Sequence, residues 1–220
     1  EYFSKWEKIN SSKKVTSISI LNDADYYIKS FDDEHYLIST VAGELELGKQ
    51  DTFGILPINL LFSISLAMEA GASINDIKSS VKRFKGVEGR FYKYLLPNKA
   101  TIIDDSYNAN PQSMKSSLDQ LSMFNKNKIF VMGDMGELGD KSYIHHLSIF
   151  KYAKELGINY LFYMGEFKDE AKTVFGENCS TFDDIIIMTD HIRKILSEKT
   201  VVLIKASRFM NFDLIVKGLR

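Results

Sequence analysis

The densest chemical signal in this sequence lies between residues 102 and 111, which read Ile-Ile-Asp-Asp-Ser-Tyr-Asn-Ala-Asn-Pro. Two β-branched apolar residues lead into a pair of carboxylates, Asp104 and Asp105, and then into a polar turn. Asn110 and Pro111 follow as a favoured N-cap and a favoured first helical residue. The pattern predicts a strand, a loop and a helix start. In an open α/β sheet, ligands bind at such a loop, beside the positive end of the following helix.

The two carboxylates are expected to differ in role, because neighbouring residues of a strand point to opposite faces of the sheet. One would face a ligand and the other would support the loop, although strand-end solvation or helix capping would also explain either of them. Asn108 and Asn110 add neutral donors and acceptors, which suit a zwitterionic dipeptide or a peptide acceptor. Asn110 would alternatively serve as a helix cap alone.

Three other segments carry cations or tight turns beside expected strands. Residues 205–208, Lys-Ala-Ser-Arg, follow an apolar run, and their cations would either bind an anion or be solvated. Residues 133–139, Gly-Asp-Met-Gly-Glu-Leu-Gly, would form a ligand-contacting loop or only a turn. Arg90 follows a joint with two glycines, and its permanently charged guanidinium would either bind phosphate oxygens or be solvated.

In this order, the motifs resemble those of the C-terminal domain of the Mur ligase family. The motifs are Gly89-Arg90 and the segments 104–111, 133–139 and 205–210. The likeness covers residues 54–220 and is greatest to ligases that add D-alanyl-D-alanine to UDP-N-acetylmuramoyl-tripeptide. It implies an ATP-dependent carbon-nitrogen ligase of peptidoglycan synthesis. Another paralogue of the same family is the nearest alternative.

For the nucleotide, the resemblance implies contacts from three residues. Arg90 would reach the phosphates of ATP and stabilise the charge that develops during phosphoryl transfer. Asp105 would accept hydrogen bonds from the ribose hydroxyls, and these two residues would be the catalytic ones of this chain. Asn59 would contact adenine, although the His that precedes this Asn in the family is absent.

For the substrates, the resemblance implies five residues at two strand ends. Asn108 and Asn110 would contact the dipeptide or its peptide acceptor. Lys205, Ser207 and Arg208 would bind the carboxylate of the incoming amino compound through charge-assisted hydrogen bonds, which are about twice as strong as neutral ones. These roles predict a site at the carboxyl edge of the sheet.

The reaction that the resemblance implies forms an amide through an acyl phosphate. The substrate carboxylate takes the γ-phosphoryl group of ATP, Mg²⁺ neutralises the phosphates, and the amine of D-alanyl-D-alanine then displaces phosphate. The P-loop and most metal ligands would lie outside this chain, which begins with Glu1 rather than Met. We therefore expect a piece of a longer protein, inactive by itself and monomeric, whose partners are these small molecules.

Composition argues against several other classes of protein. The formal net charge of −1 and the absence of a basic stripe give no reason to expect a nucleic-acid partner. No apolar run approaches the length of a membrane span, and the lone Cys179 excludes an internal disulfide, which favours a reducing cytoplasm. The four His residues lack the spacing of a metal site, so we predict none.

The hydrophobic pattern predicts an α/β protein with two domains. Residues 1–85 would be the C-terminal part of a central ATP-binding domain: antiparallel strands over 15–48, then helices over 58–71 and 73–84. Residues 86–220 would form a Rossmann-like, doubly wound and mostly parallel sheet. Its expected strands are 100–104, 128–132, 159–164, 179–182 and 201–205, alternating with helices over 111–123, 142–156, 167–175, 184–197 and 211–219.

Three alternative interpretations fit parts of the sequence. Residues 43–50 nearly match a P-loop, but Gln50 replaces the metal-binding hydroxyl and no helix follows until about residue 58, so a hairpin edge strand is favoured. A phospho-receiver-like signalling module would use the acidic pair, Asp134 and Lys205, but it lacks the hydroxyl expected at Met164. An aspartyl-phosphate hydrolase would need Asp-x-Asp where this chain has Asp-Asp-Ser.

Overall fold

A computed structural model describes residues 3–20, 22–32, 34–49, 51–52 and 54–220 of the chain. The chain forms two compact units, Glu1–Lys85 and Gly86–Arg220. The first two residues, Asp33 of the expected turn at 32–33 and Gln50 of the P-loop-like segment lie outside the described residues. Each unit is described by itself below.

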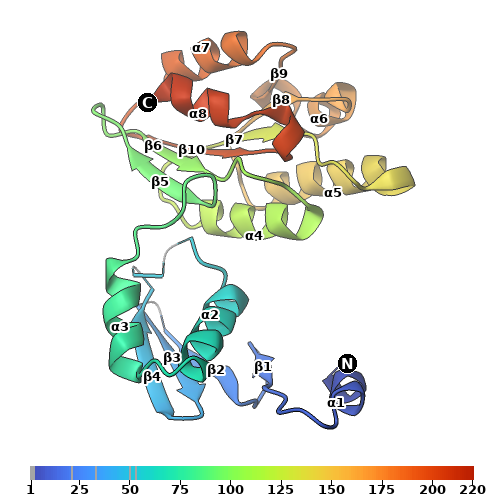
Figure 1. Cartoon of the computed structure of the whole chain (residues 1–220). Coiled ribbons are helices and arrows are strands. Elements are labelled where there is room, and N and C mark those ends of the chain that lie inside the picture. The colour runs from blue at the N-terminus through green and yellow to red at the C-terminus, as the bar shows by residue number, and fades with distance from the viewer. Residues whose placement is uncertain (1–2, 21, 33, 50, 53) are drawn as a thin grey trace. The chain divides into compact units, whose positions relative to one another are not determined.

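In its described residues, the first unit combines a four-stranded sheet with three helices (Figure 1). Its elements are α1 (Phe3–Ile9), β1 (Ile18–Ser19), β2 (Tyr26–Phe31), β3 (His35–Thr40), β4 (Gly43–Gly48), α2 (Pro57–Glu69) and α3 (Ile74–Arg83). The strands lie in the order β1-β2-β3-β4, and β2, β3 and β4 are antiparallel as the sequence predicts. Apolar side chains from β2, β3 and β4 pack against α2 and α3 to form one core.

The prediction of antiparallel strands is wrong for β1, which runs parallel to β2 with Ile18 opposite Tyr26. Hydrogen bonds between Ser17 and Asp25 explain why β1 runs parallel to β2. The Asp25 carboxylate accepts hydrogen bonds from the Ser17 amide at 2.8 Å and from its hydroxyl at 2.7 Å. These hydrogen bonds hold the residue before β2 beside the residue before β1, so the two strands start at the same end and run in the same direction.

The segment that resembles a P-loop forms a β-hairpin, as the alternation of its residues predicts. β4 pairs antiparallel with β3 over its whole length and lies at the edge of the sheet. Leu45 and Leu47 point into the core, whereas Glu46 between them is exposed. Residues 43–48 therefore belong to an edge strand rather than to a phosphate-binding loop.

The sequence marks both ends of α2 and the start of α3. α2 starts at Pro57, and Gly71 takes a left-handed conformation, φ +98°, just after the helix. Ser73 and Asp76 form a reciprocal capping box at the start of α3. The predicted boundaries of these two helices are confirmed to within one or two residues.

The second unit is a six-stranded, mostly parallel sheet with helices on both faces (Figure 1). Its elements are β5 (Tyr92–Leu95), β6 (Thr101–Asp104), α4 (Pro111–Ser122), β7 (Asn127–Gly133), α5 (Ser142–Glu155), β8 (Tyr160–Met164), α6 (Lys168–Phe175), β9 (Cys179–Thr181), α7 (Ile185–Ile195), β10 (Thr200–Lys205) and α8 (Asp213–Leu219), with short 3-10 turns at Gly139–Lys141, Gly176–Asn178 and Arg208–Met210. The strands lie in the order β5-β6-β10-β7-β8-β9.

Alternate strand residues enter two separate cores, one on each face of this sheet. Ile103 packs with α4, α5 and α6, whereas its neighbour Ile102 packs with α7 and α8. The same alternation holds along β10, where Leu203 and Ile204 enter opposite cores. Burial on both faces explains the continuous apolar runs and confirms the prediction of a doubly wound sheet.

The sequence analysis missed one strand, β5, which pairs antiparallel with β6 at the edge of the sheet. Its residues alternate between half-buried and exposed positions, so they lack the continuous apolar run of the central strands. The signal was the alternation of aromatic and other residues from Tyr92 to Leu95, which is typical of an edge strand. β5 places the Gly89-Arg90 motif beside the carboxyl end of β6.

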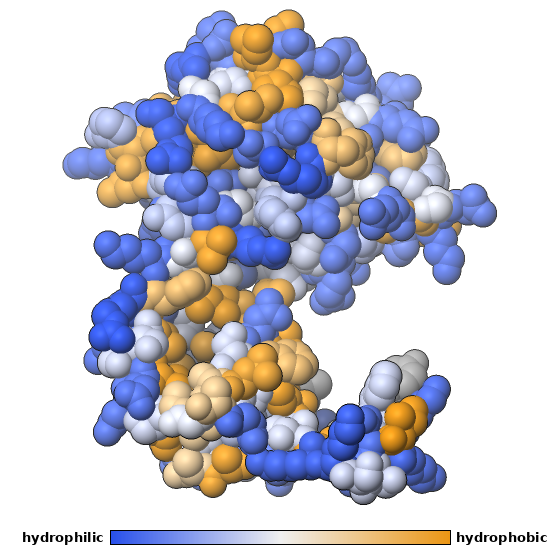
Figure 2. All heavy atoms as spheres, viewed as in Figure 1, coloured by the Kyte–Doolittle hydropathy of each residue, from blue (hydrophilic) through white to orange (hydrophobic). Residues whose placement is uncertain are grey.

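On the face that Figure 2 shows, the second unit is largely polar, and hydrophobic residues gather over α7. Ile186 and Ile187 at the start of α7 are 71% and 64% exposed. Within the described ranges, no helix combines the length and the apolar character that crossing a bilayer requires.

Candidate functional site

Three loops meet at the carboxyl edge of the sheet in the second unit. They follow β6, β7 and β10, and β10 lies between the other two strands. Ile204 pairs with both Asp104 and Val131, so the three strands end at nearly the same level. The segments 104–110, 133–139 and 205–208, which are far apart in the sequence, therefore form one site.

The Asp104 carboxylate fixes the loop that follows β6. One of its oxygens accepts a hydrogen bond from the Gly89 amide at 3.0 Å. The other accepts from the Ser106 amide at 3.1 Å and from the Ser106 hydroxyl at 2.6 Å. Asp104 is buried, so it supports the loop and attaches the preceding Gly89-Arg90 segment to it.

The Asp105 carboxylate forms the centre of a buried network on the other side of the strand. Lys205 donates a hydrogen bond to it at 2.6 Å, Ser117 of α4 donates another at 2.6 Å, and the Phe91 amide donates a third at 3.1 Å. Lys205 also donates to the carbonyl oxygen of Asn108 at 3.0 Å. The Lys205 and Asp105 side chains are only 3% and 12% exposed, so the ion pair is shielded from water.

Ser207 joins the three loops to one another. Its hydroxyl donates to the Ala109 carbonyl at 3.2 Å and accepts from the Gly136 amide at 2.8 Å. Its own amide donates to the Asp134 carbonyl at 3.0 Å. Because both roles of the hydroxyl are occupied by the protein, Ser207 sets the spacing of the loops.

Ala206, which follows Lys205, packs against Gly133 at the end of the neighbouring strand β7. A Cβ atom added to Gly133 would lie 2.7 Å from the Ala206 Cβ atom, which is too close for two real side chains. Only one of the two residues can therefore carry a methyl group at this contact, and in this chain it is Ala206, directly after β10, rather than residue 133 at the end of β7. This explains how the segment 205–208 accommodates Ala206.

Arg90 lies in the open over an aromatic ring. Its guanidinium carbon is 4.3 Å from the centroid of the Tyr107 ring, a cation-π contact. Gly89 has φ +79° and its carbonyl accepts a hydrogen bond from the Tyr107 amide at 3.0 Å, which brings the two segments together. Stacking fixes the plane of the guanidinium and leaves its edge N–H groups available to an anion.

The remaining predicted substrate residues lie on the exposed rim of the site. Asn108 is exposed, and its side-chain oxygen accepts only from the Ala109 amide among the described residues. Asn110 is exposed and caps α4 by accepting from the Ser113 amide at 2.8 Å. Arg208 is largely exposed, with an ion pair to Asp213 at 3.2 Å.

One cluster in the site was missed by the sequence analysis. Tyr163 donates a short hydrogen bond to the Asp134 carboxylate, and the Glu166 amide donates to the other oxygen at 3.0 Å. Burial, followed by the hydrogen bond to Asp134, strongly raises the pKa of the Tyr163 phenol. The cluster ties the loop after β7 to the loop after β8 and keeps this tyrosine protonated.

A buried histidine completes the support of the loop after β7. His146 accepts a hydrogen bond at Nε2 from the Met135 amide at 2.9 Å, and Nδ1 lies 2.8 Å from the Ser142 carbonyl. These partners require a proton on Nδ1 and none on Nε2. Burial lowers the pKa of His146, which agrees with a neutral ring. Its role is structural in this arrangement.

Two further expectations concern Asn59 and metal binding. Asn59 is exposed in the first turn of α2 in the other unit. For metal binding, no group of three His, Cys, Asp or Glu side chains within the described parts of the chain could hold an ion.

Ser117, which donates to Asp105, was not predicted from the sequence. Its signal was its position on the apolar face of α4 between Met114 and Leu118.

Comparison with known proteins places this site in a family. The model of the Mur ligase glutamate ligase domain matches residues 89–208, which contain all three loops. UDP-N-acetylmuramoyl-tripeptide--D-alanyl-D-alanine ligases from Escherichia coli and Haemophilus influenzae are each 26% identical to this chain over 98% of its length. The match covers 49% and 48% of those proteins, so the chain spans about half the length of these curated relatives.

Solved structures share the fold of the whole chain. A crystal structure of MurF from Acinetobacter baumannii aligns over 100% of this chain and 50% of its own, with a TM-score of 0.83 and 22% identity. MurF ligase from Thermotoga maritima in complex with ADP aligns over 99% of this chain and 51% of its own, with a TM-score of 0.74 and 18% identity. The family match overturns the interpretation as a phospho-receiver-like module.

Proposed function

This chain belongs to the Mur ligase family, and we propose that it is the C-terminal half of an ATP-dependent ligase that joins D-alanyl-D-alanine to UDP-N-acetylmuramoyl-tripeptide. The relatives that carry this name match 98% of the chain. The observation that carries the proposal is the carboxyl edge of the sheet. There, buried pairs fix three loops, while Arg90, Asn108 and Arg208 remain exposed above them.

The nucleotide end of the site is assigned to Arg90. A guanidinium held flat on Tyr107 presents N–H donors in a fixed plane, which suits the oxygens of a phosphate group. Asp105 already accepts three hydrogen bonds, so we propose that it acts mainly by positioning Lys205 and the loop. Its first oxygen accepts from Phe91 alone, which leaves acceptor capacity for a ribose hydroxyl. Asn59 remains a proposed adenine contact from the other unit.

The amine substrate is assigned to the rim formed by Asn108, Asn110 and Arg208. Arg208 is the most exposed cation of the segment 205–208 and would pair with the dipeptide carboxylate. Lys205 uses two of its three N–H groups internally, so it adds positive charge from beneath the rim. Ser207 holds the loops at the distance that the rim requires.

The chemistry proposed for the complete protein is acyl phosphate formation followed by attack of the amine. ATP supplies the phosphoryl group, and Mg²⁺ would accompany its phosphates, although we assign no residue of this chain to the metal. The residues of this chain would contribute charge stabilisation through Arg90 and orientation of the amine through the rim. The 220 residues alone are therefore expected to release no phosphate from ATP.

Binding of the dipeptide to this chain tests the assignment of the rim. Titration with D-alanyl-D-alanine, followed by NMR, should shift the amides of residues 104–110 and 205–208 in a saturable way. Arg208→Gln should weaken these shifts, whereas Lys217→Gln, another exposed partner of Asp213, should not. Shifts with L-alanyl-L-alanine equal to those with D-alanyl-D-alanine would contradict the assignment of the rim as the dipeptide site. Equal weakening by Arg208→Gln and Lys217→Gln would contradict it as well.

A further inference from the structure

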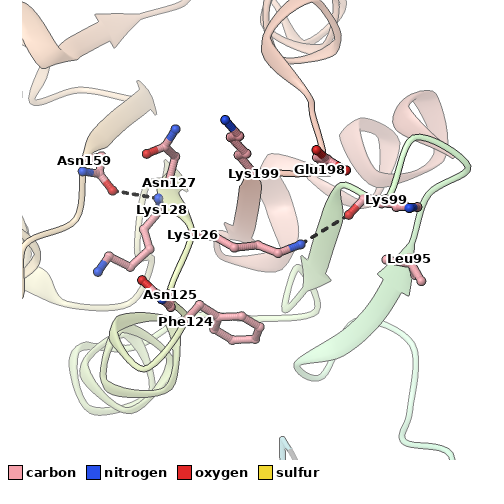
Figure 3. Close-up of a pocket in the computed structure, with 10 residues that line it drawn as sticks. All are labelled: Leu95, Lys99, Phe124, Asn125, Lys126, Asn127, Lys128, Asn159, Glu198 and Lys199. Carbon is pink, nitrogen blue, oxygen red and sulfur yellow. Dashed lines mark hydrogen bonds between the residues drawn. The ribbon is translucent and has the colours of Figure 1, made fainter.

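A concave site lies at the amino edge of the same sheet, opposite the edge described above (Figure 3). It has a volume of about 830 Å³, within the range of about 300 to 1,000 Å³ that is typical of small-molecule sites. Its walls come from the turn between β5 and β6 and from the segments that lead into β7, β8 and β10. We call it the amino-edge pocket. Its lining residues are Leu95, Lys99, Phe124, Asn125, Lys126, Asn127, Lys128, Asn159, Glu198 and Lys199.

Backbone hydrogen bonds hold the walls of the amino-edge pocket together. The Asn127 amide donates to the Lys199 carbonyl at 2.8 Å, and the Asn159 amide donates to the Lys128 carbonyl at 3.0 Å. Lys126 reaches across to the Lys99 carbonyl at 3.3 Å, as Figure 3 shows. These contacts join the walls of the pocket to one another.

The charge of the pocket is strongly unbalanced. Four lysines line it against one carboxylate, that of Glu198. Among the described residues, Lys99, Lys128 and Lys199 form no ion pair, although the chain as a whole carries a net charge of −1. Three side-chain amides, Asn125, Asn127 and Asn159, add further polar groups. A concentrated positive field of this kind attracts anions.

One lysine occupies a backbone conformation that a simple turn would give to glycine. Lys99 has φ +62°, in the left-handed region that only glycine adopts without strain. It lies in the turn between β5 and β6, whose geometry is set by Asn98 accepting from the Ala100 amide. The geometry of the turn does not require a positively charged side chain at this position. The presence of Lys99 beside the pocket therefore needs an explanation other than the turn.

Compensation of helix ends is the competing explanation. α4, α5 and α7 lead into the lining segments, and each helix C-terminus carries about half a negative charge. Lysines near such ends stabilise a fold without binding anything. With Glu198 included, however, these ends offset only part of the charge of four lysines.

We propose that the amino-edge pocket binds a small molecule that carries two or more linked phosphate groups. A compact ammonium group suits a phosphate oxygen of high charge density, and several lysines around one hollow suit a chain of phosphates better than a single carboxylate. Phe124, half-buried in the wall, would contact an apolar part of the ligand. The proposal is independent of the ligase assignment, because the pocket lies at the other edge of the sheet.

NMR titration of the chain with inorganic triphosphate at fixed ionic strength tests the proposal. Saturable shifts are expected at the amides of residues 124–128 and 198–199. The double substitution Lys128→Gln with Lys199→Gln should weaken binding about tenfold, since two attractive charges are lost. Glu198→Gln should strengthen it, because a repulsive charge is removed.

A second lysine pair provides the matched control. Lys151 and Lys194 are exposed on α5 and α7 and do not line the pocket, so changing both to Gln alters the net charge equally. This variant should change the affinity less than about twofold. Shifts confined to residues 104–110 and 205–208, no saturable shift at all, or equal weakening by the two variants would overturn the proposal and leave helix-end compensation as the role of the lysines.

Discussion

At the scale of single residues, the site contains two kinds of charged side chain, a buried ion pair and exposed cations. Lys205 and Asp105 are shielded from water and satisfy each other, whereas Arg90 and Arg208 remain at the surface. A buried pair contributes little net stability compared with an apolar pair, but removal of one partner leaves an uncompensated charge. The buried pair therefore fixes the geometry, and the exposed cations are left for ligands.

Lys205→Met should lower the free energy of unfolding of the second unit by about 3 to 5 kcal/mol, because the Asp105 charge would lose its partner. Urea unfolding, followed through the amide signals of β10, measures the loss. The double variant Asp105→Leu with Lys205→Met should recover part of it. Lys217→Met, which removes an exposed ion pair, should cost less than about 1 kcal/mol. Equal losses for the two lysines would contradict a shielded pair.

His146 should make the stability of the second unit depend on pH. Its pKa is lowered in the folded protein from 6.5, chiefly by burial, so the unfolded chain binds more protons in this range. The contribution is complete above pH 6.5 and is lost as the pH falls through the folded pKa. Urea midpoints at pH 7.5 and 5.5 should differ less in His146→Gln than in the parent. An unchanged difference between the two midpoints in His146→Gln would contradict this role of the buried ring.

At the scale of elements, each functional loop is fixed by the strand before it and by the helix or turn after it. The apolar runs and the caps at Ser73 and Asn110 made most elements predictable, because they act over a few residues. β5 was missed, since an edge strand buries only alternate residues. The partnership of Asp105 with Lys205 was not predictable either, because residues separated by 100 positions meet only when β6 lies beside β10.

Gly89→Ala should disturb the approach of Arg90 to its aromatic platform. The added Cβ atom would lie 3.2 Å from the Tyr107 Cβ atom, and the residue has φ +79°. Gly157 provides a control, since it has φ +69° but open space around it. Gly157→Ala should cost about 1 kcal/mol for strain alone, and Gly89→Ala should cost more in urea unfolding. Equal losses of unfolding free energy in the two variants would show that the structure accommodates the added Cβ atom beside Tyr107 at no cost.

Asn110 should combine helix capping with contact to the dipeptide. Asn110→Ser keeps a capping oxygen, so its stability should stay near that of the parent, whereas Asn110→Ala should lose about 1 kcal/mol. Both substitutions remove the side-chain amide and should weaken D-alanyl-D-alanine binding measured by NMR titration. Normal binding by Asn110→Ser would mean that the residue is only a cap.

At the scale of the whole molecule, the proposed function gives the chain an acceptor-side site but only part of a ligase. It covers about half of the relatives that it matches, and its two units carry different predicted contacts to ATP, Asn59 in one and Arg90 in the other. The family could be recognised from the sequence because four ordered motifs mark the same edge of one sheet. The amino-edge pocket could not, since its lysines come from separate segments that the fold brings together.

The most direct test of the central claim is product formation by the gene product that carries these 220 residues. The purified protein would receive ATP, Mg²⁺ and UDP-N-acetylmuramoyl-tripeptide, with D-alanyl-D-alanine or with single amino acids, and products would be identified by mass spectrometry. We expect a pentapeptide product and one phosphate released per amide bond, both strongly reduced by Arg90→Gln. Extension by a single amino acid instead would identify another Mur ligase paralogue, and no product with any amine would contradict the assignment.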